Sequence, residues 1–249
     1  MLIEIDNLSK SFGGLAAVSD LTFGLEPGEI HGLIGPNGAG KTTTFNLVSG
    51  FYTPDAGTIV FNGENIAGMK MHQIAKKGAV RTFQGTTLFK EFTTLDNVIV
   101  GRYLHTKQSI GSALFGTARK SEKENEVKAR EILEFLGLGD VIDELAANLS
   151  HGHQRALGIA IGLAAEPKLL MLDEPFTGMN PEETRQMMNL IRKVRDQGVT
   201  ILLVEHDMQA VMGLCEKITV LNFGRLLAQG GPDEIRNNGD VIEAYLGTG

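Results

Sequence analysis

Short apolar runs separated by Gly, Asn and Asp fill the first 66 residues and predict β-strands. These runs are LIEI, AAVSDLTFGL, EIHGLIG and GTIVFNG, and we expect hairpins to connect most of them. A helix is expected to interrupt the strands over residues 40–49. A short helix over residues 71–78 and a strand at AVRTFQ are expected to follow.

Between residues 85 and 149 the pattern becomes helical and the long buried-strand runs disappear. The segment TTLDNVIVGRYL begins with polar capping residues, and EKENEVKAREILEFLGL places apolar residues among charges at helical spacing. The intervening TKQSIGSALFGTARKSEKE is rich in Gly and Ser and then in charge, so we interpret it as a surface loop. This middle section is a candidate sub-domain.

The last hundred residues alternate between helix and strand. The helices are HGHQRALGIAIGLAAEP and PEETRQMMNLIRKVRDQG, and the strands are KLLMLDEP and VTILLVEHD. Both strands are continuous apolar runs, as expected where helices cover both faces of a parallel sheet. The pattern therefore predicts α/β architecture, completed by a tail of two strands and two short helices.

Composition narrows the class of protein. A length of 249 residues with 42% apolar and 21% charged positions fits one folded domain with an inserted lobe. The net charge of −7 argues against a nucleic-acid partner, and the single cysteine, Cys215, fits a reducing compartment and a buried structural role. The first residues do not resemble a secretory signal, and the apolar run over residues 156–165 is too short to cross a bilayer. We therefore expect any membrane role to come through a partner.

The segment GPNGAGKT fits the pattern G-x-x-x-x-G-K-[ST] between a buried strand and a helix. Glycines allow backbone N–H groups to turn toward phosphate oxygens, and the helix N-terminus adds its positive dipole end. Lys41 supplies a charge for the β- and γ-phosphates, and the Thr42 hydroxyl is a hard oxygen ligand for Mg²⁺. The motif alone leaves kinases, GTPases, motor ATPases and transport ATPases open.

Further polar residues stand at the ends of predicted strands. Asp173 and Glu174 end KLLMLDEP, and because successive strand residues point to opposite sides, the two carboxylates can differ in role. Asp173 suits a Mg²⁺ shell and Glu174 a general base. Gln84 and His206 follow two other strands, and ligands of parallel sheets gather beyond such strand ends.

The ordered set SFGG, GPNGAGKT, TFQ, LSHGHQR, LLMLDEP and LLVEH resembles the ATP-binding-cassette (ABC) family of ATPases over essentially the whole chain. The resemblance implies an α/β P-loop NTPase with a mixed α/β core, an antiparallel β sub-domain and an inserted helical sub-domain. It implies one ATPase domain over residues 1–249. Residues 1–85 and 156–249 would form the core and residues 86–155 the helical sub-domain.

The resemblance also implies a role for each matching residue. Phe12 would stack on adenine, Gln84 would sense Mg²⁺ and water, Asp173 would bind Mg²⁺, Glu174 would be the catalytic base and His206 would contact the γ-phosphate. The phosphates and Mg²⁺ of the nucleotide are assigned to Gly35, Pro36, Asn37, Gly38, Ala39, Gly40, Lys41, Thr42 and Thr43. The interface loop of the family falls at TGMNP, where this chain has Asn180 in place of the usual Asp.

The segment LSHGHQR has two histidines one residue apart, which raises the question of a metal site. Ser150 is a good N-cap for a following helix, on which residues two apart do not face each other, so a metal site is disfavoured. The resemblance places this segment as the family signature L-S-G-G-Q, with His151 and His153 replacing Gly and Gln. Ser150, Gly152 and backbone N–H groups would then contact the γ-phosphate bound to a second cassette. His153 is either an exposed polar substitute or a source of pH dependence in dimer closure.

Such cassettes work as head-to-tail pairs, so the resemblance implies a second ATPase subunit, identical or related. Within the family, VRTFQ, the excursion near residues 105–120, LDEPFTGMNPEET and the ending GPDEIRNNGDVIEAYLG look like the ATPase subunits of branched-chain amino-acid importers, with urea and amide importers as close relatives. This implies integral membrane permease subunits, an indirect solute-binding protein outside the membrane, and a peripheral place at the cytoplasmic face of the inner membrane. A soluble ABC ATPase in cofactor assembly or another non-transport role is the alternative. A pseudo-ATPase is disfavoured because Lys41, Thr42, Asp173, Glu174 and His206 are all present.

Overall fold

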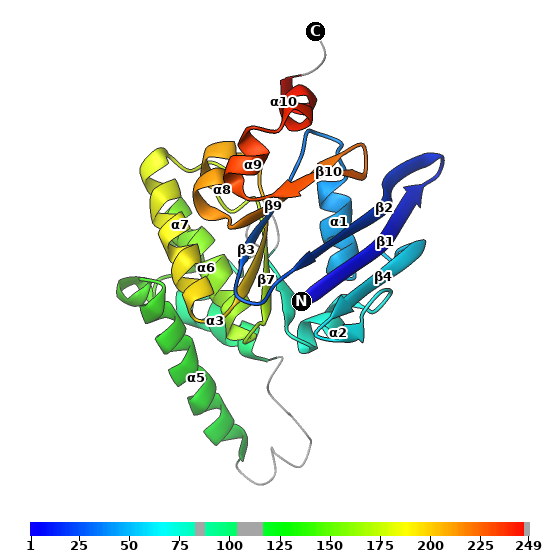
Figure 1. Cartoon of the computed structure of the whole chain (residues 1–249). Helices are drawn as coiled ribbons and strands as arrows, with labels where there is room; N and C mark the ends of the chain where they lie inside the picture. Colours follow the sequence, from blue (N-terminus) through cyan, green and yellow to red (C-terminus); the bar gives the residue numbers. More distant parts are fainter. Residues whose placement is uncertain (83–87, 104–116, 247–249) are drawn as a thin grey trace.

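The computed structural model describes residues 1–82, 88–103 and 117–246, and its strands form two sheets (Figure 1). Sheet A is antiparallel and has the order β2-β1-β4-β5. Its strands are β1 (Ile3–Phe12), β2 (Leu15–Leu25), β4 (Ala56–Phe61) and β5 (Glu64–Asn65). Buried and exposed residues alternate at the start of β1, which is the pattern of a strand covered on one face.

Sheet B has the order β10-β9-β3-β8-β7-β6 and is parallel except for the hairpin that joins β9 to β10. Its strands are β3 (Ile30–Ile34), β6 (Ala79–Arg81), β7 (Leu169–Asp173), β8 (Thr200–Val204), β9 (Lys217–Asn222) and β10 (Arg225–Gly230). All residues of β3, β7 and β8 are buried, which confirms the prediction of a sheet covered on both faces.

One sequence prediction about connectivity is wrong for β3. The run EIHGLIG was expected among hairpin-connected strands, but β3 leaves sheet A and pairs in parallel with β8 and β9. Four of its five residues are apolar or Gly, and all five, including His31, are buried, so an antiparallel sheet covered on one face offers no place for them. In sheet A, β1 lies between β2 and β4 and pairs with both strands.

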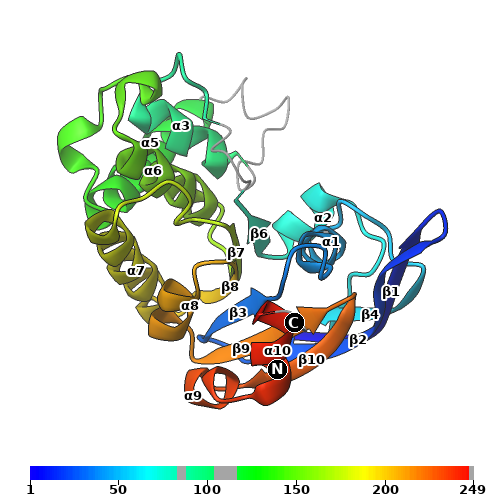
Figure 2. The same ribbon diagram turned by 90° about the horizontal axis from the view of Figure 1, so that it is seen from above.

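The helices cover sheet B and form a separate group beyond it. They are α1 (Lys41–Val48), α2 (Met71–Lys76), α3 (Thr94–Arg102), α5 (Thr117–Phe135), α6 (His151–Ala164), α7 (Pro181–Asp196), α8 (Met208–Leu214), α9 (Pro232–Arg236) and α10 (Gly239–Leu246), with short 3₁₀ turns η1 (Gly139–Val141) and η2 (Ala146–Asn148). Figure 2 shows α3, α5 and α6 at one end of the molecule and strands β1, β2 and β4 at the other.

The surface loop predicted between residues 106 and 124 is partly wrong, because residues 117–124 belong to α5. Their Lys and Glu residues are good helix formers, so the high density of charge indicates the start of a helix and not a loop. The rest of that segment lies outside the described residues. No helix in the described part of the chain combines the length and apolar character needed to cross a membrane.

Two hydrophobic cores lie on opposite faces of sheet B. Leu170 and Leu172 of β7 point into a core shared with the helices, whereas Leu169 and Met171 point into a core shared with sheet A and α1. This alternation follows from the two-residue period of a strand. Because both faces are packed, the carboxyl ends of β3, β7 and β8 are held at one edge, where ligands of parallel sheets bind.

Candidate functional site

The loop between β3 and α1 has the expected strand-loop-helix context. Gly40 precedes Lys41, the first residue of α1, with a left-handed φ of 99°. A Cβ atom at Gly40 would lie 2.6 Å from the carbonyl oxygen of Ala17 in β2, so a larger residue would push the loop away from sheet A. The glycine therefore lets the loop pack tightly against its support while its N–H groups lie at a helix N-terminus.

Lys41 folds back over this loop. Its Nζ donates hydrogen bonds to the carbonyl oxygens of Gly35, at 2.7 Å, and Pro36, at 3.0 Å. Partial burial lowers the pKa of Lys41, and the charge of Glu174 opposes that shift. The ammonium group thus gives up part of its hydration for backbone carbonyls, and an incoming phosphate would offer it a charged partner.

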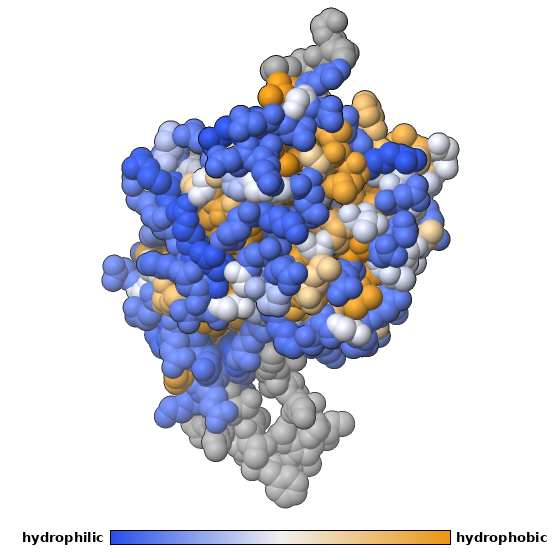
Figure 3. Space-filling view, viewed as in Figure 1, coloured by the Kyte–Doolittle hydropathy of each residue, from blue (hydrophilic) through white to orange (hydrophobic). Residues whose placement is uncertain are grey.

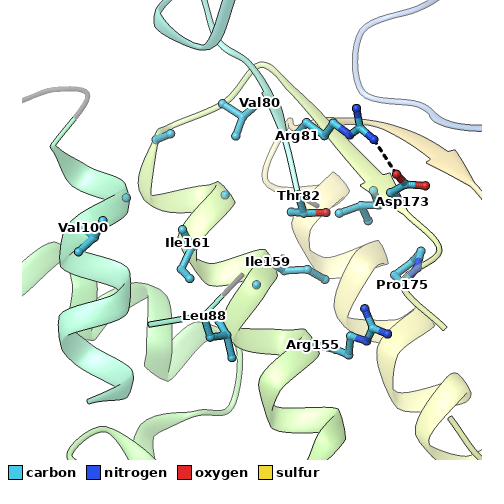
Figure 4. Close-up of a pocket in the computed structure, with 15 residues that line it drawn as sticks. Val80, Arg81, Thr82, Leu88, Val100, Arg155, Ile159, Ile161, Asp173 and Pro175 are labelled. Atoms are coloured by element: carbon cyan, nitrogen blue, oxygen red, sulfur yellow. Dashed lines mark hydrogen bonds and ion pairs between the residues drawn. The ribbon is translucent and has the colours of Figure 1, made fainter. Parts of the chain in front are cut away.

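Asp173 is fixed by a buried ion pair with Arg81 of β6 (Figure 4). Arg81 Nη2 lies 2.8 Å from Asp173 Oδ2, and both side chains are less than one-tenth exposed. The guanidinium also donates to Asn46 Oδ1 of α1 at 2.5 Å and lies over the Phe45 ring, 5.1 Å from its centroid. Arg81 therefore ties the end of β7 to the helix that begins at the phosphate loop.

A cavity of about 300 Å³ opens beside this ion pair, between β6 and β7 on one side and α3 and α6 on the other (Figure 4). Its lining in the described residues is mostly apolar, with Arg81, Asp173 and Arg155 as its charged members. Thr82, the last described residue before the gap at residues 83–87, also lines it. Gln84, expected to sense Mg²⁺ and water, lies inside that gap and so outside the described residues.

Glu174 stands next to Asp173 but has different neighbours, as the strand period predicted. Its backbone takes a left-handed φ of 47°, which is uncommon for a residue with a side chain and is found at functional sites. Its N–H donates to Val204 O of β8 at 2.9 Å, and its Oε2 accepts from Thr177 Oγ1 at 3.3 Å. His206 Nδ1 lies 3.8 Å from Glu174 Oε1, so the structure brings these two predicted residues together.

Phe12 is the last residue of β1, and 42% of the residue is exposed. The ring makes an edge contact with Tyr52, with centroids 5.0 Å apart, and Lys10 Nζ lies 5.6 Å from its centroid. Hydrophobic surface gathers over β10 and the neighbouring β1–β2 hairpin in the space-filling view (Figure 3). An exposed ring there is available for stacking, and adenine binding remains a prediction.

The signature segment begins α6. Ser150 is the N-cap, and its Oγ accepts from His153 N at 3.2 Å, which confirms the predicted helix start. His151 Nε2 lies 3.4 Å from Thr177 O, whereas His153 lines a cavity of about 510 Å³ against α7 together with Ser150 and Gly152. The two imidazoles therefore face different parts of the protein. No group of three metal-ligating side chains occurs in the described ranges of the chain.

The loop over residues 177–181, TGMNP, leads directly into α7. Asn180 is the N-cap of that helix, and its Oδ1 accepts from the N–H groups of Glu182 and Glu183 at 2.9 and 3.0 Å. Asn caps helices as well as Asp does, so the substitution keeps this structural role. Through His151 and Arg155, which both approach Thr177 O, α6 contacts the same loop.

Sequence reasoning missed two buried charged residues, Arg81 and Glu205. Glu205 immediately precedes His206 and is 1% exposed, and its carboxylate accepts backbone hydrogen bonds from Phe176, His206 and Asp207. Burial raises its pKa, and these three hydrogen bonds together with His206 oppose that shift. The sequence does show a charged residue near the strand end in VRTFQ and in LLVEHD. It does not show that Arg81 and Glu205 are buried, because their partners lie far away along the chain.

The C-terminal helix α10 also reaches the phosphate loop. Tyr245 of α10 is more than one-third exposed as a whole residue, yet its hydroxyl accepts a hydrogen bond from the backbone of Gly35. Burial of the phenol raises the pKa of Tyr245 to about 12, although this hydrogen bond acts in the opposite direction. The last described helix is thus attached to the first residue of GPNGAGKT.

Comparison with known proteins gives consistent matches. The profile of a family described as "ABC transporter" matches residues 18–177, and one described as "Branched-chain amino acid ATP-binding cassette transporter" matches residues 225–249. The chain is 45% identical to the high-affinity branched-chain amino acid transport ATP-binding proteins LivG of Escherichia coli K12 and BraF of Pseudomonas aeruginosa, covering 99% of this chain and 98% of each relative. A nucleotide-free ATP-binding cassette from an ABC transporter has a similar structure, with 30% identity, a TM-score of 0.87 and 99% coverage of both chains.

Proposed function

Because the chain belongs to the ABC transporter family of ATP-binding proteins, we propose that it is the ATP-hydrolysing motor of an importer for branched-chain or related amino acids. The names of LivG and BraF support this solute class. The transport role of these relatives does not favour the alternative of a soluble cassette. The observation that carries the site is the pairing of Glu174 with His206 at the strand ends beside the phosphate loop.

In this proposal the phosphate loop binds the nucleotide. Backbone N–H groups of the segment Gly35–Thr43, in which only Pro36 lacks one, surround the phosphates at the start of α1. Lys41 exchanges its carbonyl partners for β- and γ-phosphate oxygens. Phe12 stacks on adenine with its exposed face. ATP and ADP are ligands of this family, and the assignment of each residue to them is the proposal.

The donor set also fits Mg²⁺. The Thr42 hydroxyl and the Asp173 carboxylate are hard oxygen ligands of the kind that this ion takes together with phosphate oxygens, and Gln84 is the third expected ligand. Asp173 Oδ2 is engaged by Arg81, which leaves Oδ1 for a further partner. When bound, Mg²⁺ would neutralise charge on the β- and γ-phosphates.

Glu174 and His206 carry the hydrolysis step. A water oxygen attacks the γ-phosphorus, its proton passes to the Glu174 carboxylate, and the bond to the ADP oxygen breaks. His206 hydrogen-bonds the γ-phosphate from its place beside Glu174 Oε1. The side chain of Glu174 is 26% exposed, so water reaches it without a large movement of the turn.

We further propose that two cassettes complete the site. The N-terminus of α6, with Ser150 and Gly152, contacts the γ-phosphate bound to the second copy or to a related cassette. Added Cβ atoms at Gly152 would meet no heavy atom within 4 Å, so this backbone is open to a partner. The proposed division places residues 1–85 and 156–249 in the core and residues 86–155 in the helical sub-domain, and α6 crosses from one to the other.

The membrane partner is proposed to bind an exposed apolar surface that we call the aromatic patch. It consists of the rings of Phe89 and Phe92 and the neighbouring side chain of Leu145. These side chains are 50%, 44% and 41% exposed, and the two rings stack with centroids 5.3 Å apart. Buried Asn97 holds the patch, since its side chain bonds both the N–H and the carbonyl of Phe89. A rigid exposed aromatic pair suits an apolar helix of a permease subunit at the cytoplasmic face of the inner membrane.

A solute-binding protein would act indirectly, through that permease subunit. The net charge of −7 does not suit a nucleic-acid partner.

The replacement Glu174→Gln tests the proposed chemistry. The amide cannot accept the water proton, so we expect ATP binding to remain, turnover to fall by about 10²-fold or more, and a closed dimer to accumulate with Mg-ATP. Steady-state phosphate release and size-exclusion chromatography with Mg-ATP measure these effects. Hydrolysis at the parent rate would refute the assignment of Glu174, and a variant that stays monomeric with Mg-ATP would count against the two-cassette site.

A further inference from the structure

Glu205 occupies a position behind both residues of the proposed hydrolytic pair. It follows the last residue of β8, the strand that lies between β3 and β7 in sheet B. Its side chain is directed into the protein, where only 1% of the residue is exposed. Burying a carboxylate costs free energy unless hydrogen bonds replace those lost to water. The hydrogen-bond partners of Glu205 therefore indicate its role.

The two oxygens of Glu205 bind two different loops. Oε1 accepts a hydrogen bond of 2.9 Å from the N–H of Phe176. Phe176 lies two residues after Glu174. Oε2 accepts from the N–H groups of His206, at 3.0 Å, and Asp207, at 3.4 Å. One carboxylate therefore connects the turn that carries Glu174 to the loop that carries His206.

The turn after β7 needs such support. Glu174 holds a left-handed φ of 47°, a strained conformation for a residue other than Gly. Two successive residues of the β8 end hold this turn: Val204 accepts from Glu174 N and Glu205 accepts from Phe176 N. Without Glu205, only the Val204 carbonyl would remain of these two contacts.

We propose that Glu205 is a positioning residue for ATP hydrolysis, because its carboxylate fixes the Glu174 turn against the His206 loop. This inference rests on the proposed function of Glu174 and His206. Glu205 Oε2 lies 3.8 Å from His206 Nδ1, the same distance that separates this nitrogen from Glu174 Oε1. Glu205 itself touches no reacting atom in this proposal and acts through the two residues that it aligns.

The replacements Glu205→Gln and Glu205→Asp test the proposal. Three N–H donors face two carboxylate oxygens, so the amide of Gln presents its own N–H₂ to at least one donor, and Asp is too short to reach both loops. We expect kcat to fall about 10- to 100-fold, the loss associated with small misplacements of reacting groups. The dissociation constant of a fluorescent ATP analogue should change less than about twofold.

The matched control is Glu216→Gln. Glu216 also accepts a backbone N–H, from Ile30 at 2.5 Å, but at the opposite end of β3, away from the strand ends that carry the site. Circular dichroism melting of each variant shows that it is folded. Parent kcat in folded Glu205 variants, or an equal loss in Glu216→Gln, would overturn the inference.

A double replacement separates alignment from general stability. In a His206→Ala background, Glu205→Gln should cost less kcat than it costs in the parent, because one of the two aligned groups is already missing. Losses that simply multiply would overturn the link to His206. If Glu174→Gln hydrolyses ATP at the parent rate, the proposed function fails, whereas inactive Glu174→Gln with fully active Glu205 variants defeats this inference alone.

Discussion

Some side chains in this site form hydrogen bonds within the protein that a bound ligand would replace. Lys41 shows this most clearly, because its ammonium is partly buried and binds the Gly35 and Pro36 carbonyls. Burial lowers its pKa, which means that the folded protein holds this charge at some cost. A phosphate group would remove that cost.

Lys41→Ala should therefore weaken nucleotide binding without lowering stability. A charge-assisted hydrogen bond of about 1.5 to 3 kcal/mol corresponds to roughly 10- to 100-fold in affinity. Titration with a fluorescent ATP analogue measures the loss, and a thermal melt should show an unchanged or higher midpoint. The exposed Lys168→Ala is the control. Unchanged nucleotide affinity in Lys41→Ala would contradict the proposed role.

Cys215 allows a test of burial by pH. It is the only cysteine in the sequence and is buried, and desolvation raises its pKa above the usual range for a thiol. Because the thiolate is the reactive form, a thiol reagent such as Ellman's reagent at pH 8 should react at least about 100 times more slowly with folded protein than with protein in denaturant. The unfolded thiol ionises first, so this residue removes stability as the pH rises above about 8.5. Rapid modification of folded protein would contradict its burial.

Residues with sequence-local roles were predictable, and residues with long-range partners were not. Ser150 and the glycines of the phosphate loop act through backbone groups a few positions away, so their spacing identifies them. Arg81 pairs with Asp173 over 92 positions and Glu205 with Phe176 over 29, and only the fold brings these groups together. Burial of a charge cannot be inferred from an isolated strand end.

Helices and strands were also predictable where a local pattern determines them and not where distant partners do. Continuous apolar runs predicted β7 and β8 because both faces of those strands are covered by neighbours in the fold. The sheet to which β3 belongs depended on partners at β8 and β9, more than 160 residues away, which no local pattern contains. The start of α5 was missed because its sequence, TARKSEKE, has no apolar stripe at helical spacing.

The N-caps of α6 and α3 provide an element-scale test. Ser150 Oγ accepts from His153 N at 3.2 Å, and Thr93 Oγ1 accepts from Asp96 N at 3.0 Å. Ser150→Ala and Thr93→Ala should each cost about 1 kcal/mol of stability in denaturant titrations. We expect only Ser150→Ala to lower the rate of ATP hydrolysis, since only this hydroxyl faces the second nucleotide in the proposed dimer. Equal rates in the two variants would remove Ser150 from the site.

Across the whole molecule, the proposed hydrolytic site and the aromatic patch belong to different parts of the chain. The site gathers at the ends of β3, β7 and β8, whereas Phe89 and Phe92 precede α3. Arg81 binds Asp173 at the site, whereas Phe89 is bound by Asn97 of α3, so each part has its own contacts. A change at the patch should therefore leave hydrolysis by the isolated cassette intact while removing its connection to the membrane.

The double replacement Phe89→Ser and Phe92→Ser tests this separation. Loss of two aromatic anchors, at roughly 2 kcal/mol each, should weaken binding to permease subunits by about 1,000-fold if the two losses add. Co-expression with the membrane subunits of the native operon, followed by membrane fractionation, measures the cassette retained, and phosphate release by the purified cassette should match the parent. The control is Val127→Ser, an exposed apolar residue on α5 of the same region. Full recovery of the double variant in membranes would show that the permease binds elsewhere, whereas equal loss in Val127→Ser would show a nonspecific effect of reduced surface hydrophobicity.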